Sequence, residues 1–328
     1  MTFAVVTPDD ERWLVTWEAW PEREVHAHPE YVRLYEDGET RALCALAEGV
    51  LYPFLLRALP GGAEGADIIT PYGYGGAFRT GDANADDFWA GFDAWAVDQG
   101  VVAEFVRFSL FADRLLPYPG KREQRLVNVV RDLAPAEDEL WKDYEHKVRK
   151  NVNKARRSGL RVEIDEAGAR LDDFLRLYEH TLSRRDVHER YRFSREYFER
   201  IRDRLAGHFV YAHVLDGGRV VSSELALLSA TSVYSFLGGT HEAAFAHRPN
   251  DLLKVELFRW SKAAGKRRFV LGGGFRGEDG IFRYKRSFSP HGAVPFEIGT
   301  RILDREAYER LTELAGGPRE PGFFPAYR

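Results

Sequence analysis

Two similar segments, each predicting a β-meander, constrain the fold more than any other feature of the chain. They cover residues 31–59 and 210–240. In each, an apolar run is followed by an Asp-Gly pair, Asp37-Gly38 or Asp216-Gly217, and then by two further strand-like runs. Asp-Gly between alternating apolar stretches is a strong hairpin signal. The sequence therefore predicts that one meander occurs twice.

The same order of elements follows each copy. A helical pattern covers residues 85–99 in the first copy and 251–264 in the second, and each ends at a glycine, Gly100 or Gly265. A glycine just past a helix is a common C-terminal signal. Strand-like runs, VVAEFVRFSL and KRRFVLGGG, come next. This order predicts two α/β (α+β) domains in tandem, with mixed sheets flanked by helices.

Length and composition fit two domains. The chain has 328 residues, and domains average about 150 residues, so 44% hydrophobic and 13% aromatic residues suffice for two cores. We expect domains at residues 1–138 and 139–299, with residues 300–328 packing back on the first. The net charge of −4 excludes a uniformly basic nucleic-acid coat protein, so any contact with a polyanion has to be local.

Cysteine usage and hydropathy predict a cytoplasmic protein. The single cysteine, Cys44, excludes a disulfide within the chain and fits a small core residue better than a nucleophile. The N-terminal residues MTFAVVTPDDERW lack the basic and apolar regions of a signal peptide. No run approaches the ~18 apolar residues of a membrane span, so we expect no transmembrane segment.

A basic helix is predicted after a linker at residues 133–139. Apolar residues recur at helical spacing and predict one buried face: Trp141, Tyr144, Val148, Val152 and Ala155. Six Lys or Arg residues fall between His146 and Arg157, and no carboxylate interrupts them. Four of these cations form a neighbouring face that we expect to contact the phosphates of RNA: Lys147, Lys150, Lys154 and Arg157. The alternative is an ordinary solvated face.

A glycine-rich loop, ITPYGYGG at residues 69–76, is a candidate binding site. Glycines let backbone N–H groups approach a ligand closely, and tyrosines offer rigid surfaces with a hydroxyl at the tip. The candidates are Tyr72, Gly73, Tyr74 and Gly75. The alternative is a tight connection with aromatic packing.

A second glycine-rich run precedes a basic-aromatic segment. The run LGGGFRGEDG contains G-x-G-x-x-G, but no helix is expected directly after it, so we reject a dinucleotide fingerprint. We expect a strand at residues 283–288 instead. Alternation would then place Arg283, Lys285 and Ser287 on one face, and Tyr284, Arg286 and Phe288 on the other. Lys285, carried into a cleft, could stabilise developing negative charge; the alternative is a surface cation.

Several smaller patterns are weaker. Between two predicted helices lie Thr181, Arg184, Arg185 and Tyr191, and paired arginines suit phosphate recognition, although a charged helix connection is the alternative. Glu224 could act as a general base. His26 and His28 form an H-x-H without further ligands nearby, so no metal site is expected. A Ser/His/Asp triad stays open, but no residue pattern points to one.

Five stretches together resemble the FemABX family of aminoacyl-tRNA-dependent peptidyltransferases. They are ITPYGYGG, KVRKNVNKARRSG, FLRLYEHTLSRRDVHERYRFSREYF, YSFLGGTHEAAFAHRPNDLLKVELFRWSKAAGKRRFVLGGG and DGIFRYKRSF. The resemblance covers most of the chain. It implies two fused GNAT-like acyltransferase domains and transfer of an amino acid from its tRNA to an amine of a peptidoglycan precursor, as in interpeptide bridge formation. Residues 171–205 leave room for only two ordinary helices, so we expect no coiled-coil arm.

The resemblance also implies roles for individual residues. Lys285, with Tyr284 beside it, would be catalytic and act near the tRNA end or the oxyanion. Thr181 and either Arg184 or Arg185 would hold the phosphates of the precursor, and Tyr191 and Tyr234 are further substrate-binding candidates. The implied partners are aminoacyl-tRNA, as co-substrate, and a UDP-linked muramyl peptide or a related amine. No other cofactor and no DNA are expected.

Three alternatives stay open. The chain could be an acyl-CoA-dependent N-acyltransferase, a tRNA-dependent amide-forming enzyme of a natural-product pathway, or an RNA-binding protein without activity. An acyl-CoA enzyme should have a glycine-rich pyrophosphate loop before the helix of the second domain. The corresponding segment, FAHRPNDLL, contains a proline and no glycine. Acyl transfer from an activated ester requires no enzyme nucleophile, which agrees with the lack of an evident one.

Overall fold

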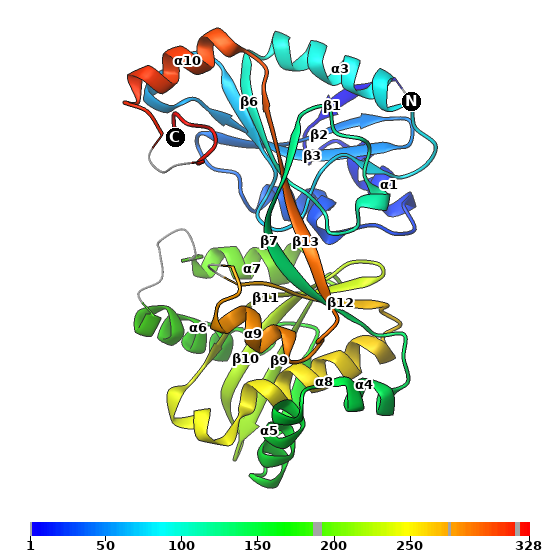
Figure 1. The fold of residues 1–328 in the computed structure, drawn as a ribbon, viewed down its shortest axis with the longest axis vertical. Coiled ribbons are helices and arrows are strands. Elements are labelled where there is room, and N and C mark those ends of the chain that lie inside the picture. Colours follow the sequence, from blue (N-terminus) through cyan, green and yellow to red (C-terminus); the bar gives the residue numbers. More distant parts are fainter. Residues whose placement is uncertain (1, 186–191, 275–276, 319–321) are drawn as a thin grey trace. The chain divides into compact units, whose positions relative to one another are not determined.

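The chain forms two compact units in the computed structural model, which describes residues 2–185, 192–274, 277–318 and 322–328 (Figure 1). Unit 1 comprises residues 1–125 and 295–328, and unit 2 comprises residues 126–294. The sequence-based boundaries lay at residues 138 and 299. In the structure, the unit boundaries after residues 125 and 294 fall inside two strands, β7 (Lys121–Asp132) and β13 (Ala293–Ile302).

Unit 1 is a mixed sheet with helices. Its strands are β1 (Ala4–Val6), β2 (Thr40–Ala47), β3 (Val50–Ala58), β4 (Ala66–Ile69), β5 (Phe78–Arg79), β6 (Val101–Arg107) and β13, in the order β1-β2-β3-β4-β6-β13, with β5 beside β3. Its helices are α1 (Glu11–Ala19), α2 (Pro29–Arg33), α3 (Ala85–Asp98) and α10 (Arg305–Leu314). The pair β4–β6 is parallel, whereas β13 pairs with β6 in the antiparallel sense. The terminal helix α10 packs on β6, where Leu311 contacts the cluster that holds Val102.

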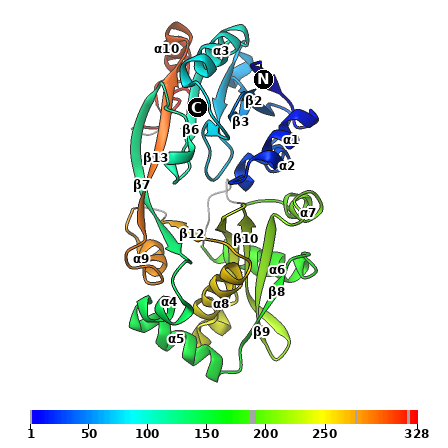
Figure 2. The same cartoon turned by 90° about the vertical axis from the view of Figure 1, so that its right-hand side faces the viewer.

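Unit 2 repeats this plan. Its strands are β7, β8 (Arg161–Asp165), β9 (Phe209–Asp216), β10 (Arg219–Leu228), β11 (Ser232–Thr240) and β12 (Arg268–Gly273), in the order β7-β12-β11-β10-β9-β8. Its helices are α4 (Glu137–Asp143), α5 (His146–Arg157), α6 (Leu171–Arg185), α7 (Arg195–Arg204), α8 (Pro249–Ala263) and α9 (Gly280–Arg286). Short 3-10 turns occur in the two units at Val25–Ala27, Pro60–Gly62, Ala112–Arg114 and Glu242–His247. Helix α8 covers one face of the unit 2 sheet, and α6 and α7 cover the other (Figure 2).

The two sheets have the same topology, which confirms the predicted duplication. The run β1-β2-β3-β4-β6 in unit 1 corresponds to β8-β9-β10-β11-β12 in unit 2, and each run ends in a parallel pair, β4–β6 or β11–β12. An antiparallel strand completes each sheet. In unit 2 this strand is β7, which follows β6 in the chain, and in unit 1 it is β13, which follows β12. The last strand of each sheet therefore comes, in chain order, directly after the parallel pair of the other copy: β7 follows β6, and β13 follows β12.

The first copy of the meander begins later than predicted. Tyr31 and Val32 lie in helix α2, not in a strand, because Pro29 occupies its first turn and the His28 side chain accepts a hydrogen bond from the Glu30 N–H. The first hairpin turn is at Gly49, not at Asp37-Gly38. Gly49 has a φ of +68°, and a Cβ there would lie 2.3 Å from the carbonyl oxygen of Asp82. The hairpin that matches Asp216-Gly217 is thus one strand further along.

The predicted helix through Trp141 and Ala155 is two helices. The backbone is extended at Tyr144 and Glu145, with ψ angles of 144° and 147°, and this separates α4 from α5. The Tyr144 ring packs against Phe258 and Phe288 in the core of unit 2. Apolar spacing alone could not reveal this break, since the pattern of buried residues continues on both sides of it.

Two further predictions concern α6 and membrane spans. Helix α6 ends at Arg185 and α7 begins at Arg195, which leaves no room for a coiled-coil arm, as predicted. Among the described residues, none of the helices combines the length and apolarity that crossing a membrane requires.

Candidate active site

A cavity of about 640 Å³ opens in unit 2 beyond the paired part of the parallel strands β11 and β12. These strands pair only up to Tyr234 and Val270. Past this point β11 continues beside β10, whereas Gly272 and Gly273 of β12 pair with β7. Ligands commonly bind where parallel strands end at their carboxyl side. Residues from α6, β10, β11, α8 and α9 line the cavity, among them Thr181, Arg184, Glu224, Ser235, Lys254, Tyr284 and Lys285.

Lys285 reaches this cavity from a helix, so the predicted strand at residues 283–288 is wrong. The Asp279 carboxylate accepts a hydrogen bond from the Phe282 N–H at 2.9 Å and caps α9, which lies beside β12 (Figure 1). A capping carboxylate outweighs the weak strand preference of the aromatic residues. As a result Tyr284 and Lys285, which strand alternation would have placed on opposite faces, both line the cavity.

The Lys285 amine is held in a partly desolvated position. Its Nζ donates to the carbonyl oxygen of Gly273 at 2.7 Å. Burial, together with the positive charge of Lys254, lowers the pKa of Lys285 to about 8, although the carboxylates of Glu224 and Asp279 oppose the shift. An amine with a pKa near neutrality can carry a proton in one step and release it in another.

The Tyr284 hydroxyl is a donor without a partner. Its oxygen is buried and makes no hydrogen bond within the described part of the chain. Burial raises the pKa of Tyr284 well above its usual value, and the carboxylates of Asp251 and Glu224 add to the effect. The phenol therefore stays protonated and can donate to a ligand that enters the cavity.

A buried ion pair forms the opposite wall. Lys254 Nζ donates to both carboxylate oxygens of Glu224, at 2.5 and 2.6 Å, and lies 3.1 Å from the Ser235 hydroxyl. Ser235 in turn donates to Glu224 at 2.8 Å. Beside this pair, the Ser222 hydroxyl lies 2.8 Å from both the Thr240 hydroxyl and the Asn250 side-chain oxygen. The sequence singled out Glu224 but missed Lys254 and Asn250. Their spacing of four residues places both side chains on one side of α8, and this signal could have revealed them.

The predicted substrate residues of unit 2 divide into three groups. Thr181 and Arg184 line the cavity, and the Arg184 guanidinium lies 4.7 Å from the centre of the Phe245 ring. The side chain of Arg185 and all of Tyr191 lie outside the described residues. Tyr234 is buried in β11, opposite Leu227 of β10, and is not among the described residues that line the cavity.

The ITPYGYGG loop belongs to unit 1. The carbonyl oxygen of Tyr72 accepts a hydrogen bond from the Tyr31 hydroxyl at 2.6 Å. Gly73 has a φ of +112°, and a Cβ there would lie 2.5 Å from the His26 ring. Tyr74 makes edge contacts with the rings of His26 and Phe296, and Gly75 continues the sheet by pairing with Phe108. The glycines thus serve close packing.

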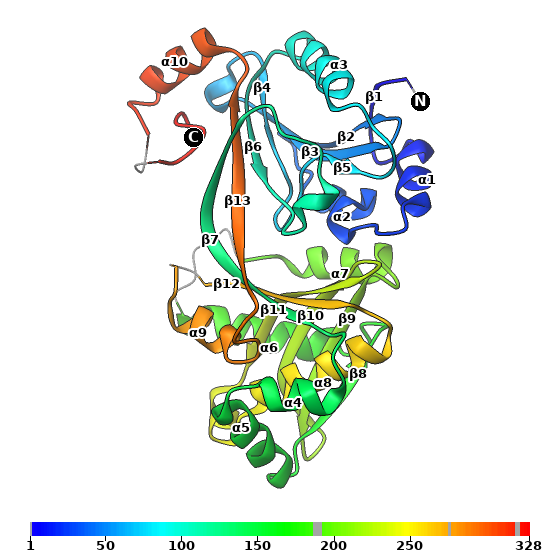
Figure 3. The ribbon, with the colours of Figure 1, turned by 45° about the vertical axis from the view of Figure 1, so that its right-hand side comes forward.

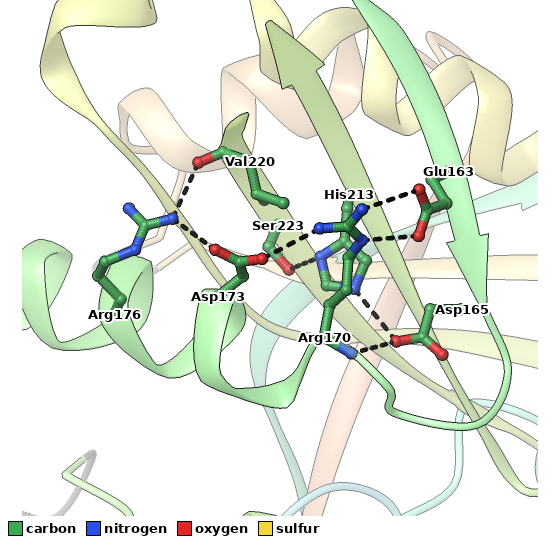
Figure 4. A network of polar contacts seen from close by, with 8 residues as sticks. All are labelled: Glu163, Asp165, Arg170, Asp173, Arg176, His213, Val220 and Ser223. Carbon is green, nitrogen blue, oxygen red and sulfur yellow. Dashed lines mark hydrogen bonds and ion pairs between the residues drawn. The ribbon is translucent and has the colours of Figure 1, made fainter. Parts of the chain in front are cut away.

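A Ser/His/Asp arrangement, to which no sequence pattern pointed, lies in unit 2 (Figure 4), and its serine, Ser223, is also among the residues that line the cavity. The Ser223 hydroxyl lies 2.9 Å from His213 Nδ1, and His213 Nε2 lies 3.6 Å from the Asp165 carboxylate. Burial lowers the pKa of His213. The side chains of Ser223 and Glu224 point to opposite faces of β10. The arrangement therefore links β8, β9 and β10 and holds the strand that presents Glu224.

The network in Figure 4 continues to the start of α6. The Asp165 carboxylate accepts from the Arg170 N–H at 2.8 Å, and the Arg170 guanidinium pairs with Glu163 at 2.8 Å. Asp173 then bonds Arg176, which donates to the carbonyl oxygen of Val220 at 3.1 Å. These contacts fix the end of β8, α6 and β10 relative to one another.

Cys44 and His26 both lie in the core of unit 1. Cys44 is buried and burial raises the pKa of its thiol, while burial lowers the pKa of His26 to about 3. In the described ranges, no group of three or more His, Cys, Asp and Glu side chains is arranged to hold a metal ion.

Comparison with known proteins identifies the fold. Residues 142–286 match the family described as acetyltransferase (GNAT) domain. The crystal structure of FemX has a TM-score of 0.70 at 14% identity, covering 94% of this chain and 99% of that one. The chain has a FemX-like fold. No curated protein matches the sequence.

Two lysylphosphatidylglycerol synthetase structures have this FemX-like fold as well. The C-terminal domain of a putative synthetase from Agrobacterium fabrum has a TM-score of 0.60 at 14% identity, covering 93% of this chain and 96% of that one. L-PGS from Bacillus licheniformis has a TM-score of 0.60 at 13% identity, with 89% and 92% covered. The predicted fold of two GNAT-like domains is confirmed. The matched GNAT segment contains every described residue that lines the cavity, from Thr181 to Lys285.

Proposed function

We propose that the protein is an aminoacyltransferase that moves an amino acid from aminoacyl-tRNA to an amine of a peptidoglycan precursor. The observation that carries this proposal is the pair of donors in the GNAT-like cavity. The Tyr284 hydroxyl is buried and has no partner in the part of the chain that the structure describes, and half-buried Lys285, its neighbour in α9, lines the same cavity. Two donors that converge on one cavity suit a reaction in which a carbonyl oxygen becomes negative.

The cavity residues supply what such a transfer requires. A neutral amine attacks the ester carbonyl, the carbonyl oxygen becomes an oxyanion, and the ribose hydroxyl leaves. Tyr284 donates to the oxyanion. The Lys285 ammonium uses one of its three protons on Gly273 and directs the others to the oxyanion or to the leaving oxygen. No covalent enzyme intermediate is involved.

Glu224 binds the attacking amine. Its carboxylate keeps lone pairs beyond those that Lys254 and Ser235 occupy. An incoming ammonium group can therefore contact the Glu224 carboxylate and transfer one proton to it, which leaves a neutral amine for the attack.

Two observations favour tRNA over CoA as the donor. Helix α8 begins with Pro249, which has no N–H, directly after Arg248 in the left-handed conformation, so this helix start offers fewer donors to a pyrophosphate. The similarly folded FemX and lysylphosphatidylglycerol synthetases are consistent with aminoacyl transfer. The match to an acetyltransferase domain favours acyl-CoA as the second candidate donor.

A mass-spectrometric transfer assay tests the proposal. The protein is incubated with a UDP-linked muramyl pentapeptide and a pool of charged tRNAs, with parallel reactions that contain acetyl-CoA or ribonuclease-treated tRNA. We expect the acceptor to gain one amino-acid residue, and ribonuclease to abolish the gain. Acyl gain only with CoA would make the protein an ordinary N-acyltransferase. If neither donor modifies this acceptor, small amines of natural-product pathways replace it in the same assay.

A further inference from the structure

A second hollow, of about 340 Å³, lies where α4 meets α5 in unit 2. The extended backbone at Tyr144 and Glu145 turns the chain, so that α4 lies beside α5 (Figure 3). The residues that line the hollow are Trp141, His146, Arg149, Lys150, Asn153 and Arg157.

The lining residues of α5 form one continuous row. His146, Lys150, Asn153 and Arg157 are separated by four, three and four positions, so they follow one side of the helix over about 16 Å. Lys147 and Lys154 lie on the flank of this row and do not line the hollow in the described structure. The four cations that the sequence grouped together therefore divide into two pairs.

The cations of the hollow lack acidic neighbours. Within the described ranges Lys150 and Arg157 have no carboxylate partner, whereas Lys147 pairs with Glu145 at 3.1 Å and Arg156 pairs with Glu256 at 2.7 Å. Arg149 is fixed by the carbonyl oxygens of Lys142, at 2.8 Å, and Tyr144. Unpaired cations around a hollow favour an anionic ligand.

The indole of Trp141 adds a flat surface to this charged row. The ring is half-buried, and the Arg156 guanidinium lies 5.6 Å from its centre. A row of cations beside an aromatic ring is the combination that binds single-stranded nucleic acid, because phosphates follow the charges and a base stacks on the ring.

We infer that this hollow binds single-stranded RNA, with phosphates on Lys150 and Arg157 and one base against Trp141. The inference rests on the proposed function, for it names the surface that holds the RNA of the aminoacyl donor. The row from His146 to Arg157 extends along three turns of α5, and its cations Lys150 and Arg157 lie about 10 Å apart along the helix. This length favours a strand over a free nucleotide such as UDP.

The position of α5 determines how bound RNA would reach the cavity. Helix α5 packs on α8 through Asn151 to Asp251 and Arg156 to Glu256. The side of α8 that carries Asn250 and Lys254 lines the cavity with Lys285. The hollow lies on the side of α5 that faces away from α8, so RNA bound there would have to extend past both helices to bring its 3′ end to the candidate active site.

Matched double variants test the inference on the full-length protein. Lys150→Gln with Arg157→Gln removes the cations of the hollow, and Lys147→Gln with Lys154→Gln removes two exposed cations from the flank of the same helix. Fluorescence anisotropy measures binding of deacylated tRNA and of a short single-stranded RNA over a range of salt concentrations. We expect the hollow variant to bind at least tenfold more weakly, with the slope of log K against log salt reduced by about 0.7 per lost phosphate contact. The flank variant should change both quantities less than half as much.

Two substitutions of Trp141 test whether a base stacks on its ring. Trp141→Phe keeps a ring that can pack, and we expect RNA to quench the tryptophan fluorescence of the wild type more than that of this variant. Trp141→Leu should weaken binding roughly 5- to 100-fold. Circular dichroism verifies that each variant is folded.

The outcomes separate the two proposals. Equal losses in the hollow and flank variants would overturn the inference, and so would displacement of the RNA by free UDP at the hollow. In either case the transfer assay, run on the same preparations, still decides the proposed function. A protein that binds no RNA and acylates with acetyl-CoA would refute both.

Discussion

The Tyr284 hydroxyl and the Lys285 amine are adjacent in the chain, but their surroundings differ. The hydroxyl is buried and bonds to none of the described residues, which destabilises the folded protein. The amine has one partner, Gly273, and a lowered pKa. A buried donor left unsatisfied in the free protein marks a group available to a ligand.

Replacing Tyr284 by Phe should separate catalysis from stability. Tyr284→Phe removes a buried hydroxyl that bonds nothing in the described structure, so we expect the melting temperature to stay the same or rise. Loss of an oxyanion donor should lower kcat by about 100- to 1,000-fold. Tyr211→Phe is the matched control, because the Tyr211 hydroxyl is likewise buried without a partner but lies on the other face of the sheet. Similar rates in both variants would contradict the role of Tyr284.

Lys285 should give the pH dependence of the reaction. Because its pKa is about 8 in the folded protein, the ammonium form is lost as the pH rises through 8, and we expect kcat to fall there. In Lys285→Arg the charge persists, so the descending limb should disappear from the pH–rate profile. If the descending limb is unchanged in Lys285→Arg, the fall in kcat is due to the titration of another group.

The same lysine should affect stability with a definite sign. Between about pH 8 and pH 10.5 the unfolded state binds more protons than the folded state, so Lys285 makes stability rise with pH over this range. In Lys285→Met this rise should be absent, and stability at pH 7 should be equal or higher. Urea unfolding at pH 7, 9 and 10.5 measures the free energy of unfolding of both proteins. If the wild type lost stability toward pH 10.5 relative to Lys285→Met, the lowered pKa would be contradicted.

At the scale of elements, helix α9 decides which residues enter the cavity. It is a seven-residue helix, too short to be stable alone, and its N-terminus depends on the Asp279 carboxylate. The buried rings of Phe282 and Phe288 hold it against the core of unit 2. A local cap and two apolar anchors thus place both candidate catalytic groups.

Loss of this cap should impair activity more than stability. Asp279→Ala should cost about 1 kcal/mol of unfolding free energy, as for other N-caps. We expect a much larger effect on kcat, because Tyr284 and Lys285 lose their fixed positions. Asp279→Ser restores a capping oxygen and should recover most of kcat, although it removes a negative charge near Lys285. If the alanine and serine variants have the same kcat, loss of the helix cap does not explain the loss of activity.

At the scale of the whole molecule, each unit depends on a strand from a distant part of the chain. The sheet of unit 1 ends in β13, whose pairing with β6 joins residues almost 200 positions apart in the chain. Helix α10 then covers Leu59, Val102 and Ala103. Arg328 and Tyr327 contact the buried Asp67 carboxylate, at 2.5 and 3.3 Å. The C-terminal segment therefore completes the core of unit 1.

Deleting residues 295–328 should unfold unit 1 selectively. The deletion leaves β6 with an unpaired edge, exposes the apolar cluster under α10 and leaves Asp67 buried without Arg328, a loss of several kcal/mol. Unit 2 keeps all six strands and should remain folded. Hydrogen exchange should then show protection for β8 to β12 but not for β2 to β4. Protection of both sets would contradict the dependence of unit 1 on its C-terminal segment.

Sequence and structure agree where the information is local and periodic. The alternation and turn at Asp216-Gly217, and the glycines after α3 and α8, predicted the repeated plan, because pleat, turn and helix end each depend on neighbouring residues. The apolar face of α5 was predicted for the same reason. Thr181, Arg184, Tyr284 and Lys285 were singled out and all line one cavity, whereas Tyr234 does not.

Errors arose where a distant contact decides between two local choices. Residues 283–288 suit a strand by alternation, yet the Asp279 cap and the core contacts of Phe282 and Phe288 make them part of a helix. Tyr144 interrupts the basic helix because its ring packs on Phe258, which is over a hundred residues away.

The sequence by itself determined that this chain contains two α/β domains of one plan, and that it carries a basic helix and the adjacent candidate residues Tyr284 and Lys285. Only the tertiary structure decided that Glu224 pairs with Lys254, that the Tyr284 hydroxyl has no partner among the described residues, and that Trp141 lines one hollow with Lys150 and Arg157. The physical reason is that burial and charge pairing depend on residues brought together from separate elements. Contacts between separate elements leave no periodic pattern in any one segment of the sequence.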